Sequence, residues 1–240
     1  MEHPRTLVFE TLDEMALKAL EWLTERTSHV EKETVAIALS GGNTPQALFE
    51  KIVKHDTGTV DWNKLLLFWG DERCVPPEHT ESNFRSAQKS ILIPLDIPED
   101  HIFRIHGETY PPLEAERYTQ VLREHLPIVD GYPKFDLILL GLGEDGHIAS
   151  IFPGDESLFD TDQWVEVSTH PTTGKQRVTL TGSVINNAEE VAFLVTGTNK
   201  AKVVAEIAKN PENCVCPAGR VLPLSGKMAW LLDKAAAADL

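Results

Sequence analysis

The chain has 240 residues, of which 42% are hydrophobic and 25% are charged, and these fractions exclude collagen-like, low-complexity and wholly disordered proteins. Its 22 basic and 37 acidic residues give a formal net charge of −15, which argues against binding to nucleic acid or to an anionic membrane surface. An anionic ligand would therefore need a local cluster of cations.

The apolar pattern alternates between helical periodicity and short continuous runs. Apolar residues at three- and four-residue spacing predict an amphipathic helix over 12–27, and further helices are expected over 45–53, from Asn83, over 112–126, over 200–209 and in the Ala-rich segment after 233. Continuous apolar or β-branched runs predict strands at 34–40, 64–72, 135–143, 164–168, 176–181, 190–196 and 227–233.

Near-continuous apolar strands separated by helices favour a Rossmann-type α/β fold, in which a mostly parallel sheet has helices on both faces. No internal repeat and no Pro/Ser-rich linker divides the chain, so a single domain over residues 1–240 is expected. Ligands of such sheets bind beyond the carboxyl ends of the strands. Polar or Gly-rich segments follow the first three predicted strands, and we expect them to meet at one crevice.

The N-terminus MEHPRTLVFE lacks the features of a secretory signal, and no apolar run reaches the ~20 residues that span a bilayer. Cys74, Cys214 and Cys216 have no second Cys/His pair at zinc-ligand spacing, so reduced thiols and no metal are expected. These observations predict a cytoplasmic protein without membrane or nucleic-acid partners. The sequence leaves open whether it is a monomer or a small homo-oligomer.

The segment SGGNTP (40–45) lies between a predicted strand and a predicted helix. Gly41 and Gly42 allow backbone N–H groups to approach a ligand, Thr44 can cap the helix, and Pro45 suits its first turn. The helix N-terminus favours an anion such as phosphate. A tight turn that binds nothing is the alternative interpretation.

Charged residues stand at the ends of three predicted strands. Asp71, Glu72 and Arg73 lie where the second predicted strand leaves the sheet, so all three could line the crevice. Arg73 offers a fork-shaped donor for phosphate or carboxylate. Arg177 and Lys200 stand at later strand ends, where cations can close an anion site. A solvated strand end with a local ion pair, or an ordinary surface charge, fits these residues as well.

The segment GLGEDGH (141–147) is the most informative motif. Asp145 and His147 are two residues apart among glycines after a buried strand, and a carboxylate beside an imidazole suits acid–base catalysis near neutral pH. The glycines keep steric bulk away from reacting atoms.

These motifs in this order resemble the glucosamine-6-phosphate isomerase/6-phosphogluconolactonase family. The resemblance runs over nearly the whole chain, through LSGGNTP, WGDER, Ser82-Asn83-Phe84, FDLILLGLGEDGHIASIFPG, RVTLT, LVTGTNKAKVV and WLLDKAAA. It implies a NagB-like fold and hydrolysis of 6-phospho-D-glucono-1,5-lactone to 6-phospho-D-gluconate, in the second step of the oxidative pentose phosphate pathway. No metal, nucleotide or organic cofactor is expected.

The resemblance also implies roles for individual residues. His147 matches the catalytic histidine that activates water, with Asp145 beside it to orient the imidazole. The role of Arg220 is left open. The expected substrate-binding residues are Gly41, Gly42, Asn43, Thr44, Asp71, Arg73, Arg177 and Lys200.

Two alternatives to a lactonase remain: an amino-sugar phosphate deaminase/isomerase and a non-catalytic sugar-phosphate sensor. In the deaminase relatives, the resemblance implies an acidic residue five positions after the histidine, where this chain has Phe152. The sensor is disfavoured because no helix-turn-helix or basic extension precedes residue 34 and the net charge is wrong for DNA.

Overall fold

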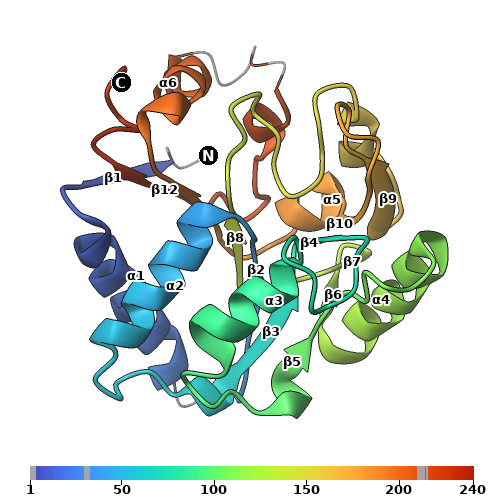
Figure 1. The fold of residues 1–240 in the computed structure, drawn as a ribbon, viewed down its shortest axis with the longest axis horizontal. Coiled ribbons are helices and arrows are strands. Elements are labelled where there is room, and N and C mark those ends of the chain that lie inside the picture. The colour runs from blue at the N-terminus through green and yellow to red at the C-terminus, as the bar shows by residue number, and fades with distance from the viewer. Residues whose placement is uncertain (1–3, 30–32, 210–213, 215) are drawn as a thin grey trace.

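A seven-stranded sheet, parallel throughout, forms the centre of the molecule in the computed structural model, which describes residues 4–29, 33–209, 214 and 216–240 (Figure 1). Its strands run in the order β1-β12-β11-β8-β2-β3-β5. They are β1 (Arg5–Phe9), β2 (Val35–Leu39), β3 (Leu65–Trp69), β5 (Ile102–Phe103), β8 (Leu137–Leu140), β11 (Val191–Val195) and β12 (Met228–Asp233). The predicted α/β fold with a mostly parallel sheet is confirmed.

Helices cover both faces of this sheet. The chain moves in one direction along the sheet from β1 to β5 and returns from β8 to β12. Because parallel crossovers are right-handed, the first three helices lie on one face and the last three on the other. The helices are α1 (Leu12–Ser28), α2 (Asn43–His55), α3 (Asn83–Ala87, continued by a π-turn at Gln88–Leu92), α4 (Pro111–His125), α5 (Gly182–Asn186) and α6 (Ala201–Lys209), with short 3-10 turns at Trp62–Lys64, Glu99–His101, Glu156–Phe159, Thr198–Lys200 and Pro217–Arg220.

The two directions of travel diverge between β2 and β8, which are neighbours in the sheet. A sheet of this kind opens a crevice at such a point, outside the carboxyl ends of the strands. Here the N–H of Gly141, just after β8, donates to Ser40 Oγ, just after β2, at 3.1 Å. The glycine-rich segments that follow the two strands are therefore side by side.

A second, antiparallel sheet contains β4 (Asp71–Arg73), β10 (Gln176–Leu180) and β9 (Val165–Thr169) in the order β4-β10-β9. A small hairpin joins β6 (Ile128–Val129) to β7 (Tyr132–Pro133). The predicted strand 64–72 is thus two strands in two sheets. Gly70 separates them, since its N–H donates to Leu39 O of the large sheet and its carbonyl accepts from Leu180 N of the small one.

Three further sequence-based expectations were wrong in detail. An unexpected strand, β1, lies at the edge of the sheet with a mixed burial pattern, so no continuous apolar run marks it. Helix α2 begins at Asn43 rather than Pro45 and has no side-chain cap, because the N-cap position is Gly42 with φ +102°. The Ala-rich segment 234–239 forms turns, since so short a stretch does not repay the cost of helix nucleation.

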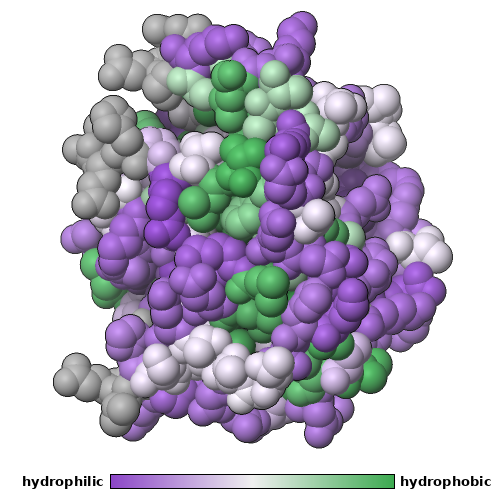
Figure 2. All heavy atoms as spheres, turned by 90° about the vertical axis from the view of Figure 1, so that its left-hand side faces the viewer, coloured by the Kyte–Doolittle hydropathy of each residue, from purple (hydrophilic) through white to green (hydrophobic). Residues whose placement is uncertain are grey.

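Aromatic and aliphatic side chains fill the space between the sheet and the helices. Phe68 stacks on Phe103 with ring centroids 4.7 Å apart and meets the edge of Phe135 at 5.4 Å. On the left-hand side of the molecule, Figure 2 shows a mostly hydrophilic surface with small, separate hydrophobic areas. No helix in the described part of the chain is long and apolar enough to cross a membrane.

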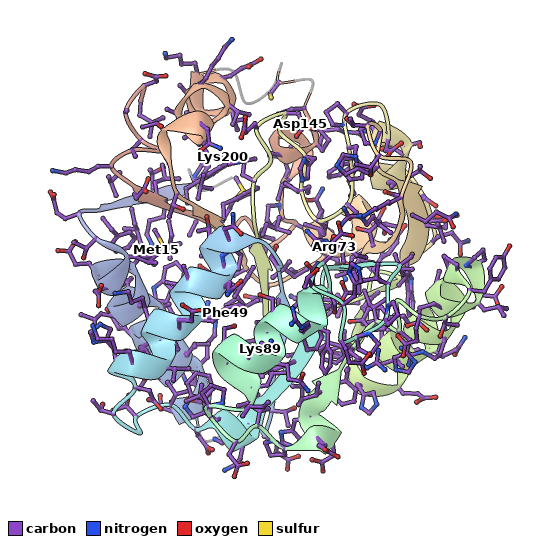
Figure 3. The ribbon with its side chains drawn as sticks, viewed as in Figure 1. Met15, Phe49, Arg73, Lys89, Asp145 and Lys200 are labelled. Carbon is purple, nitrogen blue, oxygen red and sulfur yellow. The ribbon has the colours of Figure 1, made fainter. Side chains whose placement is uncertain are left out.

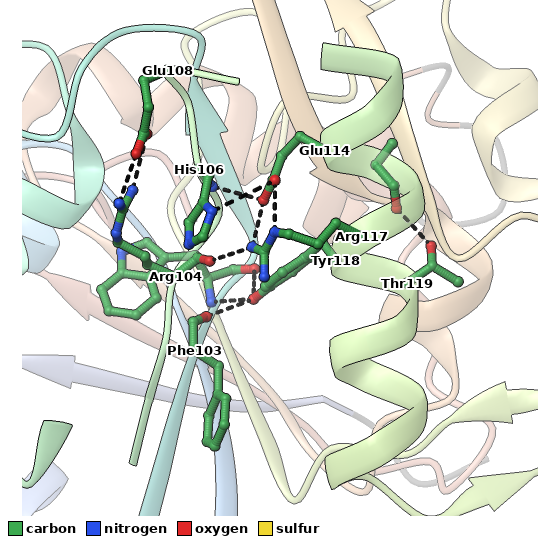
Figure 4. A network of polar contacts seen from close by, with 10 residues as sticks. Phe103, Arg104, His106, Glu108, Glu114, Arg117, Tyr118 and Thr119 are labelled. Carbon is green, nitrogen blue, oxygen red and sulfur yellow. Dashed lines mark hydrogen bonds and ion pairs between the residues drawn. The ribbon is translucent and has the colours of Figure 1, made fainter. Parts of the chain in front are cut away.

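A polar network holds α4 against the ends of β3 and β5 (Figure 4). The Tyr118 hydroxyl accepts from Trp69 N at 2.8 Å and lies within donating distance of the carbonyls of Trp69 and Phe103. Nearby, the fully buried Glu114 accepts from His106 N and from the Arg117 guanidinium. The network fixes the strand end from which β4 continues toward the cleft.

We expect Tyr118→Phe to lower the free energy of unfolding by about 1–2 kcal/mol, because it leaves the buried N–H of Trp69 without an acceptor. Urea denaturation monitored by tryptophan fluorescence measures this loss. Tyr110→Phe is the matched control, since Tyr110 is exposed and its hydroxyl has no hydrogen bond within the described chain. Equal urea denaturation midpoints for the two variants would show that the Tyr118 hydroxyl does not stabilise the fold.

Candidate active site

A cleft of about 500 Å³ opens at the carboxyl ends of β2, β8 and β11, where the sheet topology predicts a ligand site. Three of the residues around this end of the molecule, Arg73, Asp145 and Lys200, are labelled in Figure 3. The cleft is lined by Ser40, Gly41, Gly42, Asn43, Thr44, Pro45, Asp71, Arg73, Asn83, Gly141, Leu142, Gly143, Glu144, His147, Ala149, Leu194, Val195, Thr196, Asn199 and Lys200.

His147 and Asp145 form a hydrogen-bonded pair at the edge of this cleft. The imidazole Nδ1 lies 2.6 Å from Asp145 Oδ1, which also accepts from the His147 backbone N–H at 3.1 Å. Burial favours the neutral carboxyl, but the hydrogen bonds and positive charge supplied by His147 outweigh it and lower the pKa of Asp145. Because an ionised carboxylate only accepts, Nδ1 carries the proton and Nε2 is left free to act as a base.

The loop that carries this pair is closely packed against its own backbone. Gly143 N donates to His147 O at 2.9 Å, and a methyl group on Gly143 would stand 2.1 Å from His147 Nδ1. Only glycine therefore lets the backbone approach the imidazole so closely. The ring centroid of Phe152 lies 5.0 Å from that of His147.

The N-terminus of α2 faces the cleft without a capping side chain. The Thr44 hydroxyl is 2.7 Å from the Thr196 hydroxyl, so Thr44 links α2 to the end of β11 and is not the cap that the sequence suggested. First-turn N–H groups without partners are suited to an anion or to a developing oxyanion. A side chain on Gly41 would collide with Asn83, whose Oδ1 would lie 1.8 Å from the added carbon.

The charged residues of β4 point in two directions, as strand alternation requires. Asp71 and Arg73 line the cleft, whereas Glu72 is buried on the other side. Glu72 accepts from Ser82 Oγ and from the N–H groups of Asn83 and Phe84. Burial raises the pKa of Glu72 against these hydrogen bonds. The prediction that all three charges could line the crevice was thus wrong for Glu72, which holds the start of α3.

Arg177 lies directly opposite Arg73 in the β4–β10 pair and shares its face of the small sheet. Arg177 is not among the residues that line the cleft itself. Burial and the neighbouring Arg73 lower the pKa of Arg177. The Nε atoms of both arginines are buried without a hydrogen-bond partner, and the Arg177 guanidinium has none anywhere in the described chain. Two adjacent guanidiniums with unused donors are suited to a dianionic group.

Lys200 faces the cleft from the turn before α6. Burial lowers the pKa of Lys200, and the nearby carboxylates of Glu144 and Asp145 oppose this effect. Asn199 donates to Glu144 Oε1 at 2.6 Å, and Asp233 accepts from the N–H of Gly197, so the turn is held at both ends. The Lys200 ammonium makes no hydrogen bond or ion pair within the described chain.

The structure thus brings Gly41, Gly42, Asn43, Thr44, Asp71, Arg73, His147 and Lys200 to one cleft, with Asp145 and Arg177 bonded or adjacent to its lining. Sequence reasoning did not select five polar lining residues: Ser40, Asn83, Glu144, Thr196 and Asn199.

Arg220 is not among the residues that line the cleft, and it donates to Glu156 O and to the Asp160 carboxylate. Among the described residues, no three His, Cys, Asp or Glu side chains gather as a metal site would require.

The architecture and the cleft define a NagB-like α/β protein with a polar cleft at the switch point of its sheet. Residues 10–230 match the family described as glucosamine-6-phosphate isomerases/6-phosphogluconolactonase. A 6-phosphogluconolactonase from Treponema pallidum is 44% identical over 203 residues, covering 85% of this chain and 80% of that protein. The chain therefore belongs to the glucosamine-6-phosphate isomerase/6-phosphogluconolactonase family.

Solved structures agree with this assignment. The 6-phosphogluconolactonase of Trypanosoma brucei superposes with a TM-score of 0.87 at 32% identity and covers 100% of both chains. A monomeric glucosamine-6-phosphate deaminase of the NagB superfamily superposes with a TM-score of 0.83 at 20% identity, covering 98% of this chain and 100% of the other. The latter shares the fold.

Proposed function

We propose that this protein hydrolyses 6-phospho-D-glucono-1,5-lactone to 6-phospho-D-gluconate in the oxidative pentose phosphate pathway, with His147 activating the attacking water. The observation that carries the proposal is the His147–Asp145 pair beside a cleft flanked by unpaired cations. The family's lactonase members support it.

The chemistry needs only a base and a place for the negative charge. Water attacks the acyl carbon of the lactone while His147 Nε2 takes its proton, and the Asp145 carboxylate stabilises the imidazolium that forms. The carbonyl oxygen becomes an oxyanion, for which the open N-terminus of α2 offers backbone N–H donors. Collapse of the tetrahedral intermediate breaks the bond to the ring oxygen, which receives the proton from His147.

The phosphate needs cations that are not already neutralised. Lys200 and Arg177 lack ion-pair partners in the described chain, and Arg73 uses one of its guanidinium N–H groups on Glu81 O. We assign the phosphate to Arg177 and Lys200, with Arg73 beside Arg177. A protein of net charge −15 can attract a dianion only through such a local cluster.

The test is a lactonase assay on freshly generated 6-phosphogluconolactone, corrected for spontaneous hydrolysis. We expect saturable hydrolysis by the purified chain at a rate well above the spontaneous one. The same rate with and without protein would exclude the proposed function and favour a sugar-phosphate sensor, which would still bind 6-phosphogluconate in calorimetry.

We also expect no ammonia from glucosamine 6-phosphate. The position at which the deaminase relatives carry an acid is Phe152, which is 3% exposed and packs its ring on His147. A phenyl ring cannot transfer a proton during opening of the sugar ring. An ammonia-release assay beside the lactonase assay decides the matter, and His147-dependent ammonia production would favour a deaminase instead.

A further inference from the structure

Ser150 is bonded to all three strands of the small sheet. Its hydroxyl donates to Asp71 Oδ2 of β4 at 2.6 Å, and its backbone N–H donates to Thr179 Oγ1 of β10 at 3.2 Å. Its carbonyl accepts from Ser168 Oγ of β9 at 2.5 Å. Ser150 is only 1% exposed, so none of these bonds competes with solvent.

The backbone around Ser150 forms a tight turn that projects into the small sheet. Ile148 and Ile151 pair as an antiparallel bridge, and Ala149 between them has φ +45°, which few residues with a side chain adopt. The same loop carries His147 one residue before this bridge. The turn therefore fixes where the loop meets the small sheet.

The two halves of the proposed site belong to different sheets. His147 and Asp145 follow β8 of the large sheet, whereas Arg73 and Arg177 lie on β4 and β10 of the small one. The spacing between the base and the arginines depends on how the two parts are joined, and Ser150 joins them directly through Asp71, which lines the cleft.

The His147–Asp145 pair itself does not depend on this link. Its hydrogen bonds, and the one from Gly143 N to His147 O, all lie within residues 143–147. Loss of the Ser150 hydroxyl would leave the base intact and change only its position relative to the arginines.

On the basis of the proposed lactonase function, we infer that Ser150 is a positioning residue that sets the distance between the water-activating His147 and the phosphate-binding arginines. A substrate anchored by its phosphate presents its acyl carbon correctly only if that distance is right. Displacement of reacting groups by about 1 Å can cost on the order of 100-fold in rate. A lactone without phosphate is not held by the arginines, so its rate of hydrolysis does not depend on this distance.

The experiment measures kcat/KM of wild type and of Ser150→Ala for 6-phosphogluconolactone and for unphosphorylated gluconolactone. The quantity compared is the ratio of kcat/KM for the phosphorylated lactone to kcat/KM for the unphosphorylated one. We expect this ratio to fall by roughly 10- to 100-fold, mainly through kcat for the phosphorylated substrate. A general loss of folded protein would reduce both rates equally and leave the ratio unchanged. Ser150→Cys, which keeps a weak donor, should restore part of the ratio.

Ser90→Ala is the matched control. Ser90 is also buried and its hydroxyl also makes one hydrogen bond, to Ser86 O at 2.8 Å, but it lies in the π-turn away from the cleft. If Ser150→Ala does not fold, Ser168→Ala removes a different bond to Ser150 and should lower the ratio in the same direction.

An unchanged ratio in folded Ser150→Ala, with an active wild type, would overturn the inference and leave the lactonase function standing. An inactive wild type would instead refute the function itself.

Discussion

His147→Ala should reduce lactonase turnover by roughly 10²- to 10⁴-fold, which is the usual contribution of a general base. The Asp145 carboxylate lies 2.6 Å from Nδ1 of His147, which leaves Nε2 as a free base beside the cleft. Because the pKa of Asp145 lies below its ordinary value, the carboxylate stays charged in mild acid. Initial rates corrected for spontaneous hydrolysis, with circular dichroism to verify folding, measure the effect.

A matched pair elsewhere in the chain supplies the control. His55 Nε2 lies 2.6 Å from Asp13 Oδ1, the same kind of contact, but on the surface between α1 and α2. His55→Ala should leave turnover unchanged. Near-wild-type turnover of folded His147→Ala would remove this residue from the mechanism.

Arg177→Ala should lower kcat/KM for 6-phosphogluconolactone by roughly 10- to 150-fold, since a charge-assisted hydrogen bond contributes about 1.5–3 kcal/mol. Unphosphorylated gluconolactone should lose much less, because it lacks the group that Arg177 is proposed to hold. Arg177→Lys keeps the charge but not the fork of donors, so an intermediate loss is expected.

Lys175→Ala provides the comparison for Arg177. Lys175 is two residues away, but its ammonium is exposed and already paired with Glu81 at 2.6 Å. Removing it takes one positive charge from the same region without removing an unpaired donor. Equal losses on both lactones in Arg177→Ala, or equal effects of the Lys175 and Arg177 variants, would show that Arg177 does not act on phosphate.

The inner strands of the central sheet and β12 were predictable from sequence because they are largely buried, whereas the partly exposed edge strands β1 and β5 were not. All five residues of β2 and of β11 are buried, so each appears as a continuous apolar run. In the small sheet, β9 and β10 were predicted as strands. The third strand, β4, was not recognised as separate, since it has only three residues and all are charged. Its strand character comes from pairing with Arg177, Val178 and Thr179, more than 100 positions later, which local patterns do not reveal.

The cleft was predictable where a glycine-rich segment follows a buried strand, as for the segments after β2 and β8. Asn83 was not predicted as a cleft residue because its position suggests an ordinary start of a helix. In the structure Ser82 is the cap, while the Asn83 amide turns inward and donates to Asp71. The sequence likewise did not reveal that Asp71 lines the cleft while Glu72 is buried on the other face of β4. The face of β4 that meets the cleft is decided by its pairing with β10.

The first strand of the chain, β1, pairs only with the last, β12, within the described sheet. During synthesis on a ribosome, β1 therefore cannot form its strand pairing until residues 228–233 have been made. The same final strand ends at Asp233, whose carboxylate holds the N–H of Gly197 at the start of the Lys200 turn. The same strand therefore both completes the pairing of β1 and supports the turn that carries Lys200.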